Sequence, residues 1–301
     1  MSRIINETIN YKHDAKNIQN LFNPPFGRII EPHGGKLVQQ FSNDQRDLPI
    51  CEIEVNEDIY TDSFQIANGT FSPVNAFMNH EQIESVLNKN SINELTSWTM
   101  PIIFQVDKNM AKKIPNSGAI YLKKANDDHP YGILNISKIE KLKNKNKLAE
   151  LWFGTEDESH PGVSKFLSSG DFILSGRPFI LNNYIGSAKN KYELTPLQSR
   201  FVFDHNGWHN VVGFHTRNVP HLGHEYIQIN SLRKVNADAI FISPVTGEKK
   251  AGDFLADPII KCYELLIKQG VYNPYGAIIG SFNTHSRYSG PREAIFTAIC
   301  R

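Results

Sequence analysis

The feature that most constrains the fold is a regular alternation of two patterns along the second part of the chain. Short apolar runs typical of buried strands alternate with longer amphipathic runs typical of helices. The expected elements are, in chain order, 208–214, 221–235, 238–245, 257–270, 275–282 and 290–301. Strands that alternate with helices need crossover connections, and these place the strands parallel in one sheet. We therefore expect an α/β, Rossmann-like domain.

The expected helix at 257–270 carries its own start and stop signals. Asp257 is placed to act as the N-cap, Pro258 follows at the first helical position, and Gly270 stands at the C-terminal end. These signals predict one complete helix between two strands.

The first part of the chain has a different pattern. Short apolar runs broken by turn residues, as at 114–122, 133–139 and 171–181, predict a largely β domain, a compact barrel. Local helical patterns occur at 80–88 and 160–171. Because the pattern changes near 186–196, we expect two domains, 1–188 and 189–301.

Composition excludes several classes of function. The 301 residues include 32 basic and 31 acidic side chains, a net charge of +1 that gives no bulk attraction to nucleic acid or to an anionic membrane. The three cysteines, Cys51, Cys262 and Cys300, form no Cys-x-x-Cys pair. The first residues are polar, and no apolar run is long enough to span a bilayer. A cytoplasmic protein, with neither membrane nor nucleic-acid partners, is expected.

Candidate chemistry centres on the junction between the first expected strand and the helix that follows it. His215, Thr216, Arg217 and Asn218 stand at this junction. In an open parallel sheet, ligands bind beyond the carboxyl ends of the strands, and a helix N-terminus favours phosphate. The planar fork of Arg217 matches a tetrahedral oxyanion, while Thr216 and Asn218 add neutral donors.

Two histidines begin the following helix. His221 and His224 are three residues apart, a spacing that puts both imidazoles on one helix face. They are suited to hydrogen-bond the phosphates of a nucleotide, so the group fits nucleotidyl transfer. Other interpretations are a surface histidine pair or a metal site. A metal site would need a third ligand, and Glu225 points about a quarter turn away from His224. No protein-bound metal is expected.

Two later segments also follow expected strands. After 238–245, Gly247 allows close backbone approach to a ligand, and Lys249 is placed to meet phosphate. A solvated loop is the alternative. After 275–282, Arg292 stands at a helix start, where the helix dipole disfavours a cation, which hints at an anion nearby.

These motifs resemble the ATP sulfurylase family. Residues 215–224, HTRNVPHLGH, resemble its Q-x-R-N-x-x-H-x-x-H signature. Residues 243–253, SPVTGEKKAGD, resemble its P-x-x-G-x-x-K-x-G-D loop, and GPREA at 290–294 matches its G-P-R-E-A helix. Two N-terminal phrases, 32–38 and 67–78, resemble the family's PUA-like domain. The five segments keep the family's order and cover nearly the whole chain.

The resemblance implies an N-terminal PUA-like β-barrel and a nucleotidyltransferase domain. The implied reaction converts ATP and sulfate, with Mg²⁺, to adenylyl sulfate and pyrophosphate by in-line attack on the α-phosphorus. His215 and Arg217 would then hold sulfate. Thr216 and Asn218 would bind phosphate oxygens, and His221 and His224 the triphosphate and the leaving pyrophosphate.

The chain departs from the family pattern at two places. His215 stands where the family has Gln, and nothing in 1–301 matches the family's G-R-D-H-x-G loop. The catalytic domain is therefore expected to be incomplete at its C-terminus, and a homo-oligomer or a complementing C-terminal fragment is an expected partner. The alternatives are a nucleotidyltransferase with another acceptor and a non-catalytic fragment or subunit, whose PUA-like half would bind RNA.

Overall fold

A computed structural model describes residues 29–42, 51–185, 191–247, 252 and 254–301. The packing of the chain divides it into two compact units. The parallel-sheet unit consists of Leu197–Phe282 with the stretch that ends at Glu31. The mixed-sheet unit consists of Pro32–Pro196 together with Asn283–Arg301. The predicted domains 1–188 and 189–301 stay a prediction from sequence pattern, and 283–301 packs with residues from the first of them.

The parallel-sheet unit is built on a three-stranded sheet with the order β11-β10-β9. The strands are β9 (Val211–Thr216), β10 (Ala239–Pro244) and β11 (Gly276–Ile279), and both pairings are parallel. The parallel sheet predicted from the alternating pattern is confirmed. Thr216 pairs with Pro244 at the carboxyl end, so the first two strands end side by side.

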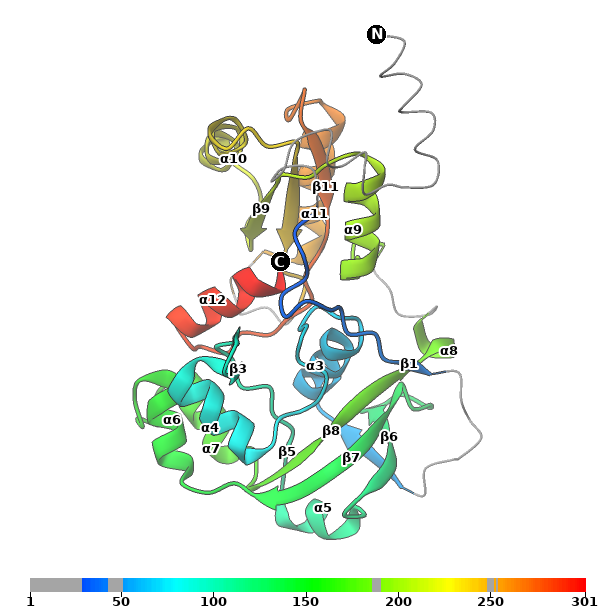
Figure 1. Cartoon of the computed structure of the whole chain (residues 1–301), viewed down its shortest axis with the longest axis vertical. Helices are drawn as coiled ribbons and strands as arrows, with labels where there is room; N and C mark the ends of the chain where they lie inside the picture. The colour runs from blue at the N-terminus through cyan, green and yellow to red at the C-terminus, as the bar shows by residue number, and fades with distance from the viewer. Residues whose placement is uncertain (1–28, 43–50, 186–190, 248–251, 253) are drawn as a thin grey trace. The chain divides into compact units, whose positions relative to one another are not determined.

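The helices of this unit are α9 (Pro196–His205), α10 (Leu222–Lys234) and α11 (Ala256–Lys268). In Figure 1, α11 runs beside β10 and β11, whose residues it contacts, and α10 contacts β9 and β10. Asp257 is not the N-cap that the sequence predicted, because the helix begins at Ala256, two residues before the predicted Pro258, and Leu255 holds the cap position. The Asp257 carboxylate instead lies 2.7 Å from the Lys261 ammonium, one turn along the surface.

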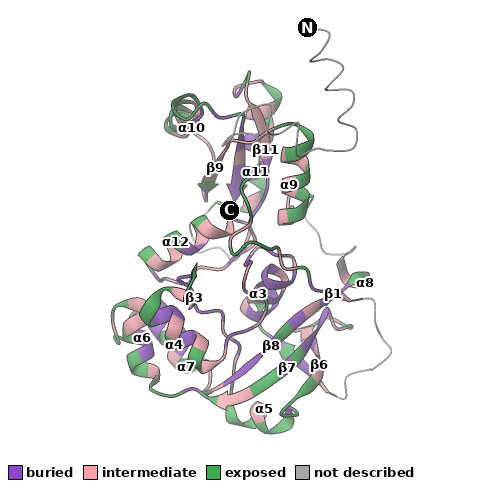
Figure 2. Ribbon diagram, viewed as in Figure 1, coloured by how far each residue is buried: buried purple, intermediate pink, exposed green. Residues whose placement is uncertain are grey.

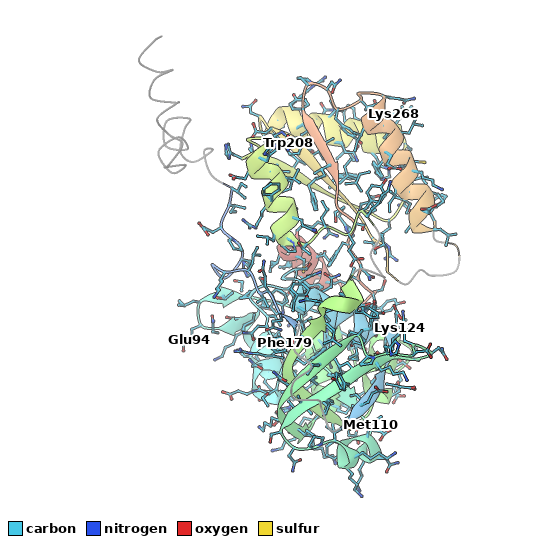
Figure 3. The ribbon with its side chains drawn as sticks, turned by 90° about the vertical axis from the view of Figure 1, so that its right-hand side faces the viewer. Glu94, Met110, Lys124, Phe179, Trp208 and Lys268 are labelled. Carbon is cyan, nitrogen blue, oxygen red and sulfur yellow. The ribbon has the colours of Figure 1, made fainter. Side chains whose placement is uncertain are left out.

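Gly276 allows an indole to pack against the start of β11. A Cβ built on Gly276 would lie 2.1 Å from the ring of Trp208, which Figure 3 labels. Because backbone and indole occupy this space together, any larger residue at 276 would displace Trp208.

The outer edge of this sheet is β9. Among the described strands, only β10 pairs with it. The helix that follows β9 carries large apolar side chains in solvent, namely Leu222, Tyr226 and Ile227. The sheet edge and the helix surface therefore expose backbone donors and apolar area on one unit.

The mixed-sheet unit holds a six-stranded sheet whose path runs β1-β8-β7-β6-β2, with β5 paired to β8. Its strands are β1 (Phe41–Ser42), β2 (Glu52–Val55), β5 (Gln105–Val106), β6 (Gly118–Lys124), β7 (Gly132–Lys141) and β8 (Phe172–Leu181). A short antiparallel pair, β3 (Ser91–Asn93) and β4 (Thr96–Ser97), stands apart from it. The predicted closed barrel is not found among the described residues, because β1 and β2 end the path and do not pair with each other.

Helices surround this sheet. They are α3 (Glu57–Ala67), α4 (His80–Lys89), α5 (Lys108–Lys113), α6 (Lys145–Phe153), α7 (Pro161–Ser168), α8 (Asn182–Ile185) and α12 (Pro291–Cys300). The patterns at 80–88 and 160–171 correspond to α4 and α7. At the start of α4, Asn79 and Gln82 form a capping box, which satisfies two backbone donors reciprocally.

The last helix contributes a side chain to the core of the mixed-sheet unit. Figure 2 shows buried residues along β8 and α3. In the same core, the ring of Phe296 on α12 lies 5.1 Å from that of Phe71 and 5.5 Å from that of Trp98. Phe296 is 1% exposed. A side chain near the end of the chain therefore fills a core otherwise formed by its first half.

An ion pair is buried in the same unit. The Arg287 guanidinium donates to both carboxylate oxygens of Asp62 on α3, at 2.5 and 3.2 Å. The two side chains are 6% and 4% exposed. This two-point contact ties the segment after Asn283 to α3.

His285 stands beside this pair and is expected to make the unit sensitive to acid. Burial, reinforced by the charges of Arg287 and Lys165, lowers the pKa of His285 well below its ordinary 6.5. The unfolded chain therefore binds a proton as the pH falls through 6.5, while the folded chain does not, so stability is present above 6.5 and is lost below it. Each pH unit costs about 1.4 kcal/mol until the folded pKa is reached.

Between pH 7.5 and pH 5, the native chain is expected to lose about 2 kcal/mol of its free energy of unfolding through His285. We expect His285→Gln to remove this loss. Urea unfolding of this unit at both pH values, followed by the fluorescence of Trp98 and Trp152 in a Trp208→Phe background, measures it. His129→Gln, on an exposed loop, is the matched control. An equal loss in native chain and His285→Gln would contradict the prediction.

Candidate functional site

The candidate site begins where β9 ends. Thr216 is the last residue of this strand and is buried. Its hydroxyl donates to the Asn218 carbonyl at 3.1 Å and accepts from the Asn218 N–H at 3.2 Å. These two hydrogen bonds form a turn directly after the strand. Arg217 and Asn218 lie in this turn, between β9 and α10. Arg217 is partly exposed, whereas His215 and Asn218 are exposed.

His221 is the N-cap of α10. Its Nδ1 accepts a hydrogen bond from the backbone N–H of Gly223 at 3.1 Å. Because Nδ1 accepts, the neutral ring carries its proton on Nε2, which leaves an N–H donor on the exposed side of the imidazole. Sequence analysis placed His221 inside the helix, whereas it lies one residue before the first helical turn.

His224 stacks on His221. The ring centroids lie 3.9 Å apart, and the planes are tilted by 34°. Burial, with the neighbouring His221 second, lowers the pKa of His224 below its ordinary 6.5, so the ring is neutral at pH 7. The edge-to-face contact with Phe214, at 5.7 Å between centroids, fixes the ring against the end of β9. The two imidazoles therefore lie together beside the N-terminus of α10.

The neighbouring strands bring a second loop to the same edge of the sheet. The Val245 N–H donates to the Thr216 carbonyl at 3.0 Å, so pairing continues past the end of β10. Gly247 follows two residues later and is partly exposed. Lys249 lies outside the described residues. Gly247 thus lies two residues beyond a residue that is hydrogen-bonded to the end of β9.

Arg292 lies in the mixed-sheet unit and has other partners. Its guanidinium donates to the carbonyls of Val86 and Leu87 and to the Asn90 side chain, at 3.4, 2.8 and 2.7 Å. These acceptors belong to the C-terminal end of α4, where the helix dipole favours a cation. The placement of Arg292 that hinted at an anion is therefore explained by α4, and the predicted anion contact gains no support from these hydrogen bonds.

The geometry of the parallel-sheet unit can hold anions. Backbone N–H groups at the start of α10, two imidazoles and the guanidinium of Arg217 lie within one strand-to-helix turn. Such an arrangement binds phosphate or sulfate oxygens and stabilises charge that moves between them. The described residues include no group of three or more His, Cys, Asp or Glu side chains arranged to hold a metal ion.

Comparison with known families divides the chain at the same region as the sequence pattern. A profile described as PUA-like domain matches residues 30–183. A profile described as ATP-sulfurylase matches residues 190–301. The first match ends before 186–196, where the sequence pattern changes, and the second begins within that range.

Curated relatives cover most of the chain. It is 37% identical over 283 residues to a sulfate adenylyltransferase of Ignicoccus hospitalis, and the match spans 91% of this chain and 72% of the relative. A sulfate adenylyltransferase of Pyrococcus abyssi is 36% identical over 282 residues, with 91% and 71% covered. One of Cenarchaeum symbiosum is 34% identical over 273 residues, with 90% and 70% covered.

The chain belongs to the ATP-sulfurylase family. The predicted resemblance of the chain to this family is thereby confirmed. A solved structure described as a hexameric APS kinase from Thiobacillus denitrificans shares the fold, with a TM-score of 0.68 at 14% identity. The match covers 90% of this chain and 50% of that chain. Within the described part, no helix is both long and apolar enough to cross a bilayer.

Sequence analysis did not single out the acidic groups of α3. Asp58 and Asp62 lie in the mixed-sheet unit against Lys165, His285 and Arg287. The sequence carries a signal for one of them. Asp62 stands between Ile59 and Ile66 at helical spacing, on an apolar face, and a carboxylate on such a face needs a buried cationic partner.

Proposed function

We propose that the chain is a sulfate adenylyltransferase. The observation that carries the proposal is the turn from Thr216 to His221, which lies between the carboxyl end of β9 and the start of α10 in a member of the ATP-sulfurylase family. In the proposed reaction a sulfate oxygen attacks the α-phosphorus of ATP. The new O–P bond forms as the bond to pyrophosphate breaks, giving adenylyl sulfate and pyrophosphate.

Each group at the turn has a proposed role. Arg217, with His215, binds sulfate, because a planar guanidinium matches two oxygens of a tetrahedral anion. Thr216 shapes the turn, and Asn218 donates to the phosphates. The Nε2–H of His221 and the ring of His224 bind the triphosphate and stabilise the leaving pyrophosphate. We also assign Gly247 and Lys249 to ATP binding.

Mg²⁺ belongs to the proposal as part of the nucleotide substrate. Magnesium is commonly held by substrate phosphates and water with few protein ligands. The donors at the turn are cationic or neutral nitrogen groups, which suit phosphate oxygens and do not suit a hard cation. The protein's proposed contribution is to bind and align the two anions.

The proposed reaction is most readily tested in the direction of ATP formation. Purified full-length chain is incubated with adenylyl sulfate, pyrophosphate and Mg²⁺, and ATP is measured. A second assay measures the exchange of labelled pyrophosphate into ATP, with and without sulfate. It distinguishes sulfate from another compound as the acceptor of the adenylyl group. Exchange that needs no sulfate would assign the site to another acceptor. A folded chain with neither activity would identify a non-catalytic member of the family or one that needs a partner chain.

The partners proposed with this function are ATP, sulfate, adenylyl sulfate and pyrophosphate. A second copy of the chain or a complementing polypeptide remains part of the proposal, because β9 has one unpaired edge among the described strands. The cytoplasmic location stays a prediction from the sequence.

The double role of His221, cap and ligand donor, can be separated by substitution. We expect His221→Ala to lower the free energy of unfolding of the parallel-sheet unit by about 1 kcal/mol, because the N-cap is lost. His221→Asn keeps a capping oxygen, so its stability is expected to stay close to that of the native chain. Both variants are expected to lose ATP formation by about tenfold or more, because a hydrogen bond to a charged phosphate is lost.

Urea unfolding and the ATP-formation assay measure the two effects separately. His221→Asn with native activity would show that the residue only caps the helix. His221→Asn as unstable as His221→Ala would contradict the capping assignment.

A further inference from the structure

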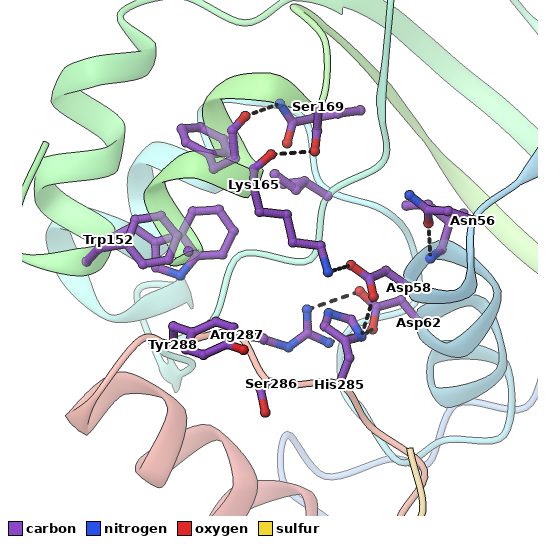
Figure 4. Close-up of a pocket in the computed structure, with 16 residues that line it drawn as sticks. Asn56, Asp58, Asp62, Trp152, Lys165, Ser169, His285, Ser286, Arg287 and Tyr288 are labelled. Carbon is purple, nitrogen blue, oxygen red and sulfur yellow. Dashed lines mark hydrogen bonds and ion pairs between the residues drawn. The ribbon is translucent and has the colours of Figure 1, made fainter. Parts of the chain in front are cut away.

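A pocket lies entirely within the mixed-sheet unit. It is hollowed between α3, α6, α7 and the segment 285–288, with a cavity volume of about 100 Å³ (Figure 4). A cavity of this order holds one small ring. None of the residues assigned above to adenylyl transfer lines it.

Two buried polar atoms on the walls of this pocket have no hydrogen-bond partner among the described residues. They are Nε1 of Trp152 and Nε of Arg287. Trp152 is 7% exposed, and the side chain of Arg287 is 6% exposed. Nδ1 of His285, on the same wall, lies 3.6 Å from a carboxylate oxygen of Asp58. A buried polar group without a partner costs about 1–3 kcal/mol, so two donors at one pocket call for a bound acceptor.

The chemistry of these atoms restricts the ligand. Indole Nε1 and guanidinium Nε carry hydrogens and can only donate. His285 has one donor and one acceptor nitrogen when neutral, and its lowered pKa keeps it neutral. The pocket therefore selects a compound that carries hydrogen-bond acceptors.

The charges that face the pocket cancel. Lys165 forms an ion pair with Asp58, and Arg287 forms one with Asp62. Figure 4 shows Lys165 extending from α7 across the hollow to the carboxylates of α3. A balanced pocket favours a neutral or singly charged ligand over a polyphosphate, because extra negative charge would meet two carboxylates.

One wall of the pocket is aromatic. The rings of Trp152 and Phe153 stack at 4.9 Å with an angle of 11° between their planes, and Phe166 meets Trp152 edge-on at 5.3 Å. Gly162 keeps this wall close to the opposite one. A Cβ there would lie 2.6 Å from the Phe153 ring and 3.0 Å from the Arg287 carbonyl. A flat wall that presents N–H donors fits a planar ring.

We propose that this pocket binds a small planar aromatic compound, neutral or singly negative, that carries hydrogen-bond-accepting oxygens. The ring lies against the Trp152–Phe153 wall, and the oxygens accept from Trp152 Nε1 and Arg287 Nε. No residue assigned to adenylyl transfer lines the pocket, and its occupation does not depend on that activity.

Three probes of similar size test the proposal on the full chain. Benzoate has the ring and the acceptors, cyclohexanecarboxylate has the acceptors without a planar ring, and benzylammonium has the ring with a cationic donor. Binding is followed by NMR of the indole N–H groups, with the Trp152 signal assigned from its loss in Trp152→Phe, and by titration calorimetry. We expect benzoate to bind most tightly and to move the Trp152 signal saturably.

Trp152→Phe keeps the ring and removes the donor, so we expect the Kd for benzoate to rise about threefold to tenfold. Trp208→Phe, in the other unit, is the matched control and is expected to leave this Kd unchanged. An unchanged Kd in Trp152→Phe would overturn the proposal, as would tighter binding of benzylammonium. A crystal structure soaked in benzoate that shows only water at Trp152 Nε1 and Arg287 Nε would also overturn it.

Discussion

Replacing Arg217 by alanine is expected to reduce ATP formation from adenylyl sulfate and pyrophosphate by about a hundredfold to a thousandfold. In the proposed reaction the guanidinium contacts sulfate oxygens while negative charge is redistributed between sulfate and phosphate. No other cationic side chain stands in the turn from Thr216 to His221. The loss should appear mainly in kcat/KM for adenylyl sulfate, because the contact is made to that substrate.

Two comparison variants sharpen this test. Arg217→Lys keeps the charge and loses the planar fork, so its activity is expected to lie between those of the native chain and Arg217→Ala. Arg233→Ala removes the same charge from an exposed position at the far end of α10 and is expected to keep native activity. A loss below tenfold in Arg217→Ala, from a chain that is active, would remove Arg217 from the proposed site.

The second large effect concerns stability. We expect Asp62→Ala to lower the free energy of unfolding of the mixed-sheet unit by about 3–5 kcal/mol, because it leaves the buried guanidinium of Arg287 without its carboxylate. The two hydrogen bonds between these side chains are both buried. Urea unfolding at pH 7, followed by tryptophan fluorescence in the Trp208→Phe background, measures the change.

A surface ion pair supplies the control. Lys261 and Asp257 are as close as 2.7 Å, but their side chains are 69% and 76% exposed. Lys261→Ala is expected to change stability by about 0.5 kcal/mol or less. Asp62→Ala combined with Arg287→Met should recover much of the loss, because no charge stays buried alone. A small effect of Asp62→Ala, similar to that of Lys261→Ala, would show that the buried ion pair contributes no more to stability than an exposed one.

The sequence predicted the parts of the fold that depend on local pattern. Apolar runs separated by helical runs predict a parallel sheet whatever the rest of the chain does, so β9, β10 and β11 were expected near their observed positions. The error at Asp257 has a local cause as well. Its side chain pairs with Lys261 on the surface of α11, and the cap position falls to Leu255, whose side chain makes no capping hydrogen bond.

Other features depend on contacts between distant residues and could not be read from local pattern. Strand runs in the first half predicted a β domain, but whether its sheet closes depends on the pairing of β1 and β2 with partners far along the chain. Arg292 finds its acceptors about two hundred positions earlier, at the end of α4. The pocket lined by Trp152 is likewise formed by α3, α6, α7 and a segment near the end of the chain. No single sequence motif predicts such a combination.

The path of the chain through the two units bears on how the protein is made. The segment Leu197–Phe282 of the parallel-sheet unit is inserted in the mixed-sheet unit, which begins at Pro32 and resumes at Asn283. On the ribosome, the first half must therefore emerge without Phe296 and Arg287, the side chains that fill its core and neutralise Asp62. The inserted unit has its strands together before those residues are synthesised. Nascent chains arrested before Asn283 would thus carry a folded parallel-sheet unit after a host unit that still lacks its last segment.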